Sequence, residues 1–393
     1  MKIVQINICD NGSTGKIMLD IMSSLDSSIQ STAYVSLKYS NNDKIKLIHT
    51  RNGYRLHKFF AMYLGLDEYG SYFETKKLIK ELNKIKPDII HLHNIHSYSI
   101  NYLLLFDYIK KNNIKVVWTL HDCWAFTGGC SHFELNNCHK WQTKCNKCDY
   151  LQSAGVLTNI NRINKLYEKK KEAFTGVKDL TIVTPSKWLA NLVGESFLGE
   201  YPIKVINNGI NFDYFKHVDN HTFDNILDRS KKILLAVASP FGERKGFSDY
   251  IKLSKILPRE YQIVMVGLTD EQIKSLPDNV IGIKRTNNQV ELAELYSIAY
   301  AFVNFTYEEV LGMVNIEALA CGTPIICYRT GGAVEMLNEY NACIIDKGDY
   351  ESTIKCLDSI EALRQNSVKY INDVKNNFSK ETMTKNYLET YGI

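Results

Sequence analysis

The sequence lacks a long apolar run. No stretch approaches the roughly 18 to 20 uninterrupted apolar residues of a membrane span, and the strand-like segment that begins at residue 2 leaves no room for a signal-peptide layout. We therefore expect a cytoplasmic protein. Its ten cysteines should then be reduced, apart from any that bind a metal.

The chain also lacks a strong charge of either sign, internal repeats and low-complexity tracts. A net charge of +4 over 393 residues fits an anionic small substrate or a weak preference for membrane surfaces, and nucleic acid is not expected as a partner. Hydrophobic residues make up 45% and charged residues 23%, which is typical of a globular protein. The length predicts two domains.

Short apolar runs alternate with amphipathic segments along the whole chain. This alternation is typical of parallel sheets covered by helices on both faces, and it predicts two doubly wound α/β domains. We place an N-terminal domain at 1–185, joined by a C-terminal helix at 379–393, and a second domain at 186–378. The expected strands are 2–8, 32–37, 88–92, 115–120, 180–185, 203–206, 232–238, 262–267, 300–305, 323–328 and 342–345. The expected helices include 74–85, 98–111, 246–256, 289–298, 351–363 and 379–391.

A glycine turn follows the first strand, with the sequence NGSTGKIM at 11–18. It is neither a P-loop nor a G-x-G-x-x-G motif, because Asp10 and Ile17 occupy positions that need other residues. Free N–H groups at a helix start favour an anion. An ordinary turn with an N-cap at Ser13 or Thr14 is the alternative.

The segment FTYEEVLGMVNIEALACGTP carries two glutamates eight residues apart, Glu309 and Glu317. A helix is expected to start near Gly312 between them, which leaves the N–H groups of Gly312, Met313 and Val314 available to a phosphate. Carboxylates suit hydroxyl groups, such as those of a sugar or a ribose. Two solvated helix charges are the alternative.

Cysteines cluster in the segment CSHFELNNCHKWQTKCNKC, with the spacing C-x7-C-x6-C-x2-C. Four thiolates in a short loop predict a structural zinc site, with disulfides or free thiols as alternatives. The four ligands would be Cys130, Cys138, Cys145 and Cys148.

Three further segments leave their roles open. His91 and His93 share one face of a strand end, as a metal pair or as structural histidines would. Residues 51–66 mix cations with aromatics and fit either a membrane surface or a helix with an inward apolar face. The run at 165–174 is most simply a solvated helix face.

Several motifs together resemble the family 4 glycosyltransferases, which have the GT-B fold of two Rossmann-like domains facing across a cleft. In chain order these are the turn at 12–15, HLHN at 91–94, TLHD at 119–122, TPSKW at 184–188, INNGIN at 206–211, ERKGF at 243–247, the paired glutamates, GTP at 322–324 and TGGAVE at 330–335. The resemblance is strongest to bacterial enzymes that extend capsular, O-antigen or exopolysaccharide units.

The resemblance implies a role for each matching residue. Lys245 would neutralise the donor diphosphate as the sugar leaves, Glu309 would hold the donor sugar and Glu317 the ribose. Gly15 would let a loop approach the diphosphate, and His121 would lie beside the donor sugar. Asn208 lies in the interdomain turn, the backbone around Arg285 would read the base, and His93 or Asn94 would touch the acceptor.

One position departs from the family pattern. Members commonly carry an arginine six residues before the lysine, and here that residue is Ser239. Arg244 either replaces it as a ligand of the diphosphate or is a surface charge.

The resemblance implies a retaining hexosyltransferase that needs no metal for catalysis. It would use a nucleotide sugar, most simply a UDP-sugar, and a glycan or lipid-linked acceptor, with the membrane's inner face as a place of work. The alternatives are a degenerate carbohydrate-binding assembly subunit and a sugar-nucleotide epimerase or hydrolase.

Overall fold

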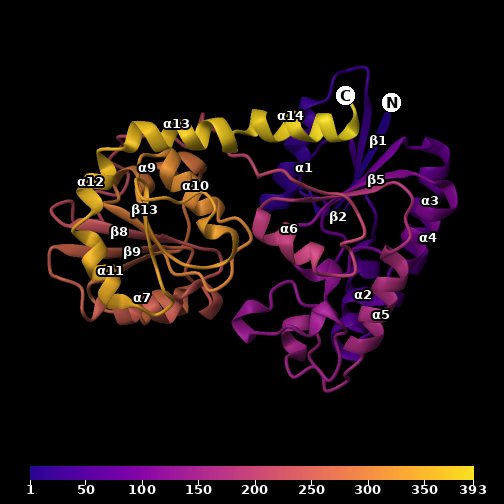
Figure 1. The fold of residues 1–393 in the computed structure, drawn as a ribbon, viewed down its shortest axis with the longest axis horizontal. Coiled ribbons are helices and arrows are strands. Elements are labelled where there is room, and N and C mark those ends of the chain that lie inside the picture. The colour runs from indigo at the N-terminus through magenta and orange to yellow at the C-terminus, as the bar shows by residue number, and fades with distance from the viewer. The chain divides into compact units, whose positions relative to one another are not determined.

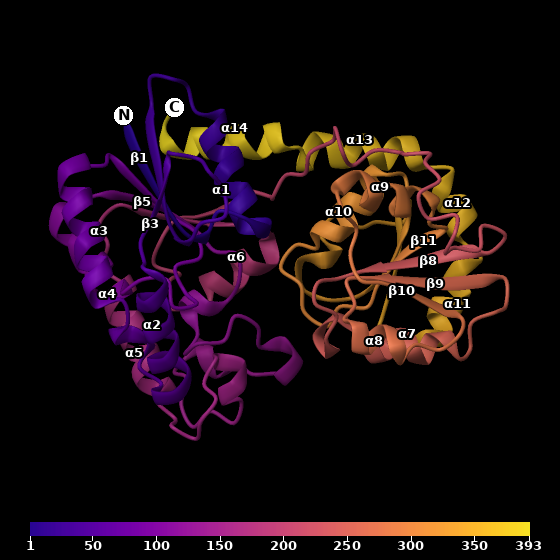
Figure 2. The same cartoon turned by 180° about the vertical axis from the view of Figure 1, so that it is seen from behind.

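The computed structural model describes residues 1–393 and divides into two compact units. The N-terminal unit contains residues 1–206 and 384–393, and the C-terminal unit contains residues 207–383. Each unit is built around one parallel sheet with helices on both faces, which confirms the predicted fold class (Figures 1 and 2). No helix combines the length and the apolar character needed to cross a bilayer.

The N-terminal sheet has seven strands in the order β3-β2-β1-β4-β5-β6-β7. Helix α1 lies on one side of it and α3 and α4 on the other (Figures 1 and 2). The strands are β1 (Lys2–Cys9), β2 (Gln30–Leu37), β3 (Ile45–Leu47), β4 (Ile89–Leu92), β5 (Lys115–Thr119), β6 (Leu180–Thr184) and β7 (Ile203–Val205). The helices are α1 (Gly12–Ser24), α2 (Arg51–Leu64), α3 (Tyr72–Ile85), α4 (Tyr102–Asn112), α5 (Ile163–Phe174), α6 (Lys187–Gly194) and α14 (Lys380–Tyr391).

The C-terminal sheet has six strands in the order β10-β9-β8-β11-β12-β13. Helices α9, α10 and α13 cover one face, and α7 and α8 cover the other (Figures 1 and 2). The strands are β8 (Lys232–Val237), β9 (Tyr261–Val266), β10 (Val280–Ile283), β11 (Ala301–Asn304), β12 (Ile325–Tyr328) and β13 (Ala342–Ile345). The helices are α7 (Phe247–Ser254), α8 (Asp270–Lys274), α9 (Gln289–Ile298), α10 (Met313–Ala320), α11 (Tyr350–Leu357), α12 (Ile360–Arg364) and α13 (Ser367–Phe378).

Local sequence explains where several helices begin. The side chain of Asn101 accepts a hydrogen bond from the backbone N–H of Leu104 and so caps α4. Ser186 caps α6 in the same way, and Thr269 forms a capping box with Gln272 at α8. The central strands are buried on both faces, as parallel strands in a covered sheet should be.

The predicted boundary after residue 185 is wrong by about one helix and one strand. Helix α6 and strand β7 belong to the N-terminal unit, because β7 pairs with β6 in register from Ile182 opposite Ile203. The predicted strand 203–206 therefore extends the first sheet and does not open the second domain. At the other end of the chain, α14 begins at Lys380 and the N-terminal unit resumes at Thr384.

The C-terminal helix is tied to the first sheet by two tyrosines. The hydroxyl of Tyr391 lies 2.5 Å from Nδ1 of His91, and Thr119 Oγ1 lies 2.8 Å from Nε2 of the same imidazole. The hydroxyl of Tyr387 lies 3.0 Å from Thr119 Oγ1. His91 is therefore a structural histidine, as one of its two predicted readings held.

Candidate active site

In the C-terminal unit, the loop after β11 leads into helix α10 with an open N-terminus. Gly312 occupies the N-cap position with φ +80°, a left-handed conformation that favours glycine, and no side chain caps the helix. No acidic residue lies in the first turn. The backbone N–H groups of Met313 and Val314 are thus at the positive end of an eight-residue helix, where an anion is stabilised.

Lys245 and Glu309 form an ion pair beside this helix start. Lys245 ends the short 3-10 helix η6 (Glu243–Lys245), and Gly246 follows it with φ +72°. A Cβ atom on Gly246 would lie 2.3 Å from the carbonyl oxygen of Phe305, so the glycine lets the two loops approach. The two predicted catalytic side chains of this unit are therefore brought together.

Arg244 adds a second cation to this site. Its Nη1 donates to the carbonyl oxygen of Glu308 over 2.9 Å, and its own carbonyl accepts from the N–H of Tyr307 over 2.8 Å. Burial favours a higher pKa for Glu309, but the ammonium of Lys245 and the guanidinium of Arg244 hold that pKa below its usual value. Glu309 is accordingly an ionised acceptor of hydrogen bonds.

Glu317 lies one helical turn into α10 and is positioned by an aromatic hydroxyl. Tyr296, a buried residue of α9, donates its hydroxyl to Oε2 of Glu317 over 3.0 Å. This contact fixes one carboxylate oxygen. Sequence reasoning singled out Glu317 but did not anticipate the tyrosine, because the two residues are far apart in the pattern that carried the prediction.

Two glycines of the TGGAVE segment lie against the backbone carbonyl of Glu309. The N–H of Gly332 donates to the carbonyl oxygen of Glu309 over 2.8 Å. A Cβ atom on Gly331, which has φ +47°, would lie 2.2 Å from that same oxygen. The motif could be recognised in the sequence, but its contact with the carbonyl of Glu309 is seen only in the folded structure.

Asn208 and Arg285 are two further residues of the predicted donor site. Asn208 is buried, and its Oδ1 atom has no hydrogen-bond partner. Arg285 is exposed just beyond β10. The carbonyl oxygen of Ile283 already accepts from the N–H of Gly267 over 2.9 Å, so this part of the backbone near Arg285 is occupied.

In the N-terminal unit, His121 follows β5 and pairs with His93, which follows β4. The two rings stack with centroids 5.6 Å apart, and His121 Nε2 lies 3.3 Å from His93 Nδ1. The other nitrogen of His93 lies 2.9 Å from Oε1 of Gln5 on β1. Burial lowers the pKa of His121 to about 4, so the imidazole is neutral at physiological pH and can accept a proton or a hydrogen bond.

A histidine–aspartate pair, which was not predicted from the sequence, adjoins the two stacked histidines. His96 Nε2 lies 2.9 Å from Oδ2 of Asp122, the residue after His121. Burial opposes ionisation of Asp122, but the interaction with His96 lowers its pKa to about 2. A small cavity at the end of the sheet is lined by both pairs and by Asn94, whose backbone N–H donates to Asn7 Oδ1 over 3.2 Å.

Gly15 lies in the first helix, α1, behind the glycine turn. A Cβ atom there would lie 2.6 Å from the carbonyl carbon of Asp10, so the turn itself requires glycine. Neither Ser13 nor Thr14 caps α1, because its N-cap residue is Asn11 and that side chain makes no capping hydrogen bond. A phosphate-facing role for Gly15 stays a prediction.

The four clustered cysteines are free thiols, which rules out disulfides between them in this structure. The structure gathers no group of three or more histidine, cysteine, aspartate or glutamate side chains that could hold a metal ion. Burial raises the pKa of Cys130 to about 12, with the neighbouring thiols adding to the effect. The zinc site stays a prediction.

Comparison with known proteins then decides the family. The model for glycosyl transferases group 1 matches residues 219–377, and the model for glycosyltransferase family 4 matches residues 34–214. A putative colanic acid biosynthesis glycosyl transferase, WcaC of Escherichia coli K12, is 30% identical over 300 residues, covering 70% of this chain and 67% of that protein. This chain belongs to the family 4 glycosyltransferases.

Other similar proteins agree with this assignment. A processive diacylglycerol alpha-glucosyltransferase of Acholeplasma laidlawii is 26% identical, over 42% of this chain and 52% of its own length. Among solved structures, sucrose-phosphate synthase of Thermosynechococcus elongatus superposes with a TM-score of 0.72 at 16% identity, covering 99% of this chain and 98% of that one. HepE of Anabaena in complex with UDP-glucose gives 0.70 at 13% identity, over 100% and 99%. The fold of this glycosyltransferase is therefore GT-B.

Proposed function

We propose that this glycosyltransferase retains anomeric configuration and transfers a hexose from a UDP-sugar to a glycan or lipid-linked acceptor in polysaccharide synthesis. The observation that carries the proposal is the cluster of Lys245, Glu309 and the open N-terminus of α10. These groups offer positive charge for a diphosphate and a carboxylate for sugar hydroxyls. WcaC, named for colanic acid biosynthesis, motivates the polysaccharide assignment.

In the proposed reaction, the bond between the anomeric carbon and the diphosphate oxygen breaks as the acceptor oxygen bonds to the same face of that carbon. The acceptor proton passes to the departing phosphate oxygen. Lys245 and the N–H groups of α10 stabilise the charge that develops on the leaving diphosphate. Glu309 orients the sugar and Glu317 the ribose. Because cationic side chains and helix N–H groups take this role, no divalent metal is required for catalysis.

A thermal-shift panel of UDP, GDP, ADP and CMP with their common sugar conjugates tests the donor assignment. A ligand that binds only the native state raises its melting temperature. We expect stabilisation by UDP and by one or more UDP-sugars, unchanged by a chelator. Stabilisation by a different base contradicts the UDP donor. If no nucleotide raises the melting temperature, a carbohydrate-binding subunit becomes the better description.

We further propose that α2 attaches the enzyme to the inner face of the membrane. Three apolar side chains of this helix are exposed, and Arg51, Arg55 and Lys58 are exposed alongside them. The apolar side chains are Leu56 at 56%, Phe59 at 51% and Tyr63 at 45% exposure. The expected inward apolar face is therefore incomplete, since only His57 and Ala61 are buried in α2.

Sedimentation with vesicles of stated composition tests this attachment. Basic and apolar side chains on one helix bind anionic lipid surfaces. The protein should sediment with vesicles that contain phosphatidylglycerol and remain in solution with pure phosphatidylcholine. Phe59→Ser should reduce the sedimented fraction. Equal sedimentation with both vesicle types, or none with either, contradicts the proposal.

We also propose a structural zinc ion bound by Cys130, Cys138, Cys145 and Cys148, which would stabilise the loop after His121. Four thiolates are a common ligand set for structural zinc. Protein purified under reducing conditions should contain about one zinc per chain. A folded protein free of zinc contradicts the site.

A further inference from the structure

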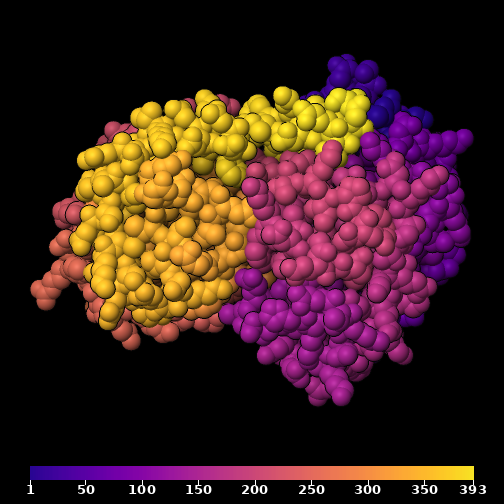
Figure 3. Space-filling model, in the orientation of Figure 1, coloured from indigo at the N-terminus to yellow at the C-terminus, as the bar shows by residue number.

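The N-terminal unit contains a larger cavity that none of the predicted site residues lines. Its volume is about 190 Å³, many times the roughly 10–15 Å³ that one water needs. The walls come from α2, η1 (Asp67–Tyr69), the segment after β4, η2 (Trp124–Phe126), the cysteine-rich loop and α5. In the space-filling view the purple and magenta residues between about 120 and 160 make up one end of this unit's surface (Figure 3).

The cavity adjoins the small cavity beside His121. His96 and Trp124 line both, and their rings pack with centroids 5.3 Å apart. A ligand with its reactive group beside His121 and His93 would therefore continue past these two side chains into the larger cavity. This adjacency is what connects the cavity to the chemistry.

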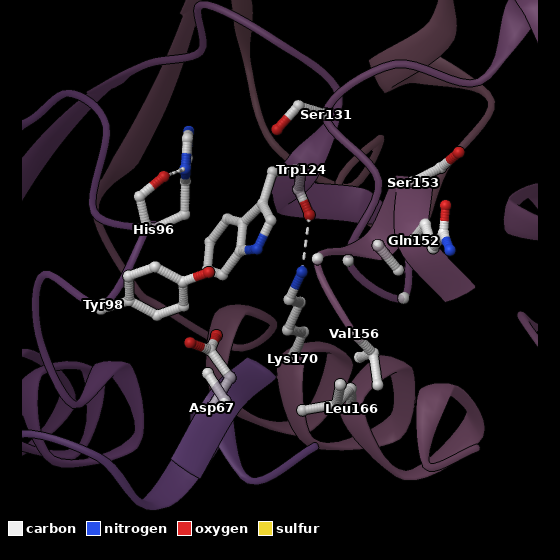
Figure 4. Close-up of a pocket in the computed structure, with 16 residues that line it drawn as sticks. Asp67, His96, Tyr98, Trp124, Ser131, Gln152, Ser153, Val156, Leu166 and Lys170 are labelled. Carbon is white, nitrogen blue, oxygen red and sulfur yellow. Dashed lines mark hydrogen bonds between the residues drawn. The ribbon is translucent and has the colours of Figure 1, made fainter. Parts of the chain in front are cut away.

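Several polar groups in the cavity are available to a ligand. The half-buried side chain of Tyr98 and the exposed side chain of Gln152 both line the cavity. Figure 4 shows Asp67, Tyr98 and His96 on one side of the cavity and Gln152 and Ser153 on the other. Such a set of carboxylate, amide and hydroxyl groups matches the donors and acceptors of sugar hydroxyls.

Tyr98 is held in place at a conformational cost. Ser97 and Tyr98 are consecutive non-glycine residues with φ of 57° and 67°, an uncommon left-handed pair of the kind that collects at functional sites. The Tyr98 ring packs edge-on against Tyr54 and His57, with centroids 6.0 and 5.9 Å away. Burial, with the nearby Asp67 carboxylate, raises the pKa of Tyr98 to about 12, so its hydroxyl remains a donor.

The charged groups around the cavity include one buried lysine and one carboxylate. Lys170 of α5 is completely buried, and its ammonium donates to the carbonyl oxygen of Trp124 over 2.7 Å (Figure 4). It also donates to the carbonyl oxygen of Thr127 over 3.2 Å. It also lies 3.6 Å from the centroid of the Trp124 ring. Lys170 thus positions the turn that carries Trp124, and its charge opposes that of Asp67. Burial lowers the pKa of Lys170 to about 7, and Oδ1 of Asp67 lies 3.2 Å from Nε2 of His57. The cavity therefore offers little net positive charge, which favours a neutral ligand over an acidic one.

We propose that this cavity binds a neutral saccharide unit of the acceptor, the one next to the sugar that receives the transferred residue. This inference rests on the proposed function, since it assigns part of its acceptor. Asp67, Tyr98 and Gln152 bind the hydroxyl groups of the saccharide unit. Trp124 and His96 separate this unit from the reactive hydroxyl.

The experiment measures saccharide binding without any nucleotide. Methyl glycosides of glucose, galactose and N-acetylglucosamine, with maltose and lactose, are titrated while tryptophan fluorescence and ligand-observed NMR saturation transfer are followed. Glucuronate and glucosamine serve as charged probes. We expect at least one neutral saccharide to saturate, and Tyr98→Phe and Asp67→Asn each to weaken its binding roughly tenfold. Tyr39→Phe and Asp43→Asn, both exposed on the same unit, are matched controls and should bind normally.

The outcomes separate this inference from the proposed function. Preference for glucuronate, no saturation by any neutral probe, or equal binding by the Tyr98, Asp67 and control variants overturns it. Gln152→Ala, at an exposed position in the short 3-10 helix η5 (Leu151–Ala154), gives an additional variant if Asp67→Asn lowers the melting temperature. Saccharide binding with no stabilisation by nucleotides would support the cavity and contradict the transferase proposal. Stabilisation by UDP without saccharide binding would support the transferase proposal and contradict the saccharide site in the cavity.

Discussion

At the residue scale, Lys245 and Glu309 owe their position to neighbours that carry no charge. Gly246 admits the loop of Phe305, and the N–H of Gly332 supports the backbone of Glu309. The resulting ion pair is partly buried, with side-chain exposures of 20% and 19%. A diphosphate entering the site competes for the same ammonium, so the pair is an interaction of the free enzyme that donor binding remodels.

Replacing Lys245 by alanine should reduce transfer by about two to three orders of magnitude, because a cation aimed at the leaving diphosphate is lost. The variant should remain folded with at most a modest fall in melting temperature, since Lys245 ends the short 3-10 helix η6 and its ion pair is only partly buried. Transfer is measured with the nucleotide sugar that stabilises the native enzyme. Lys255→Ala, an exposed lysine of the same unit, is the control and should retain normal transfer. Near-normal turnover of the Lys245 variant would remove this residue from the mechanism.

Some of these residues could be recognised from a local motif, whereas the placement of others depends on distant parts of the chain. Glu309, Glu317 and Lys245 were singled out because each belongs to a short motif with a defined spacing. The structure brings Lys245 and Glu309 together, and the roles of the three residues in transfer stay predictions. Arg244 could not be assigned from the sequence, since its direction depends on the carbonyl of Glu308, which lies 64 residues away. Lys170 was expected on a solvated helix face and is instead completely buried.

At the element scale, strand periodicity predicted most of both sheets. Eleven expected strands correspond to observed ones, whereas β3 and β10 were missed. These two are edge strands of three and four residues, and such short segments carry too little pattern to be distinguished from loops. The expected helix at 351–363 is two helices, α11 and α12.

The turn η7 (Gly331–Val334) gives a prediction about an element. Gly331→Ala should lower the free energy of unfolding by about 1–3 kcal/mol and weaken donor binding, because the new Cβ meets the Glu309 carbonyl in addition to the left-handed strain. Gly348→Ala is a matched control, since φ is +82° there and no atom lies within 4 Å of its Cβ. Denaturant unfolding and nucleotide titration measure the two effects. Equal losses in both variants would mean that only the backbone conformation matters.

At the scale of the whole molecule, the last helix, α14, packs on the sheet of the N-terminal unit. Tyr387 and Tyr391 are buried against β4 and β5, about 300 residues away in sequence. This arrangement surrounds His91 with aromatic rings, and burial lowers its pKa to about 3. Burial also lowers the pKa of His93 well below its usual value.

These histidines predict acid sensitivity. In the unfolded protein His91 takes up a proton below about pH 6.5, whereas in the folded protein it stays neutral. The free energy of unfolding therefore decreases as the pH falls from about 6.5 toward the pKa of His91 in the folded protein. One such group should lower the free energy of unfolding by about 2 kcal/mol between pH 7 and pH 5.

Denaturant unfolding at these two pH values measures the loss. His91→Gln keeps a side chain that can form hydrogen bonds and should reduce the difference between them. His217→Gln, at an exposed histidine, should not. An unchanged pH dependence in the His91 variant would contradict a neutral buried imidazole.

The sequence by itself determined that the chain alternates strands and helices in two doubly wound domains, and that its motifs are those of family 4 glycosyltransferases. Both follow from local patterns, namely apolar periodicity and fixed spacings. Only the tertiary structure decided that β7 belongs to the first sheet, that Lys170 is buried beneath Trp124, and that Asp67 and Tyr98 line one cavity with Gln152. These facts depend on segments distant in sequence packing together, and burial and electrostatics arise only from that packing.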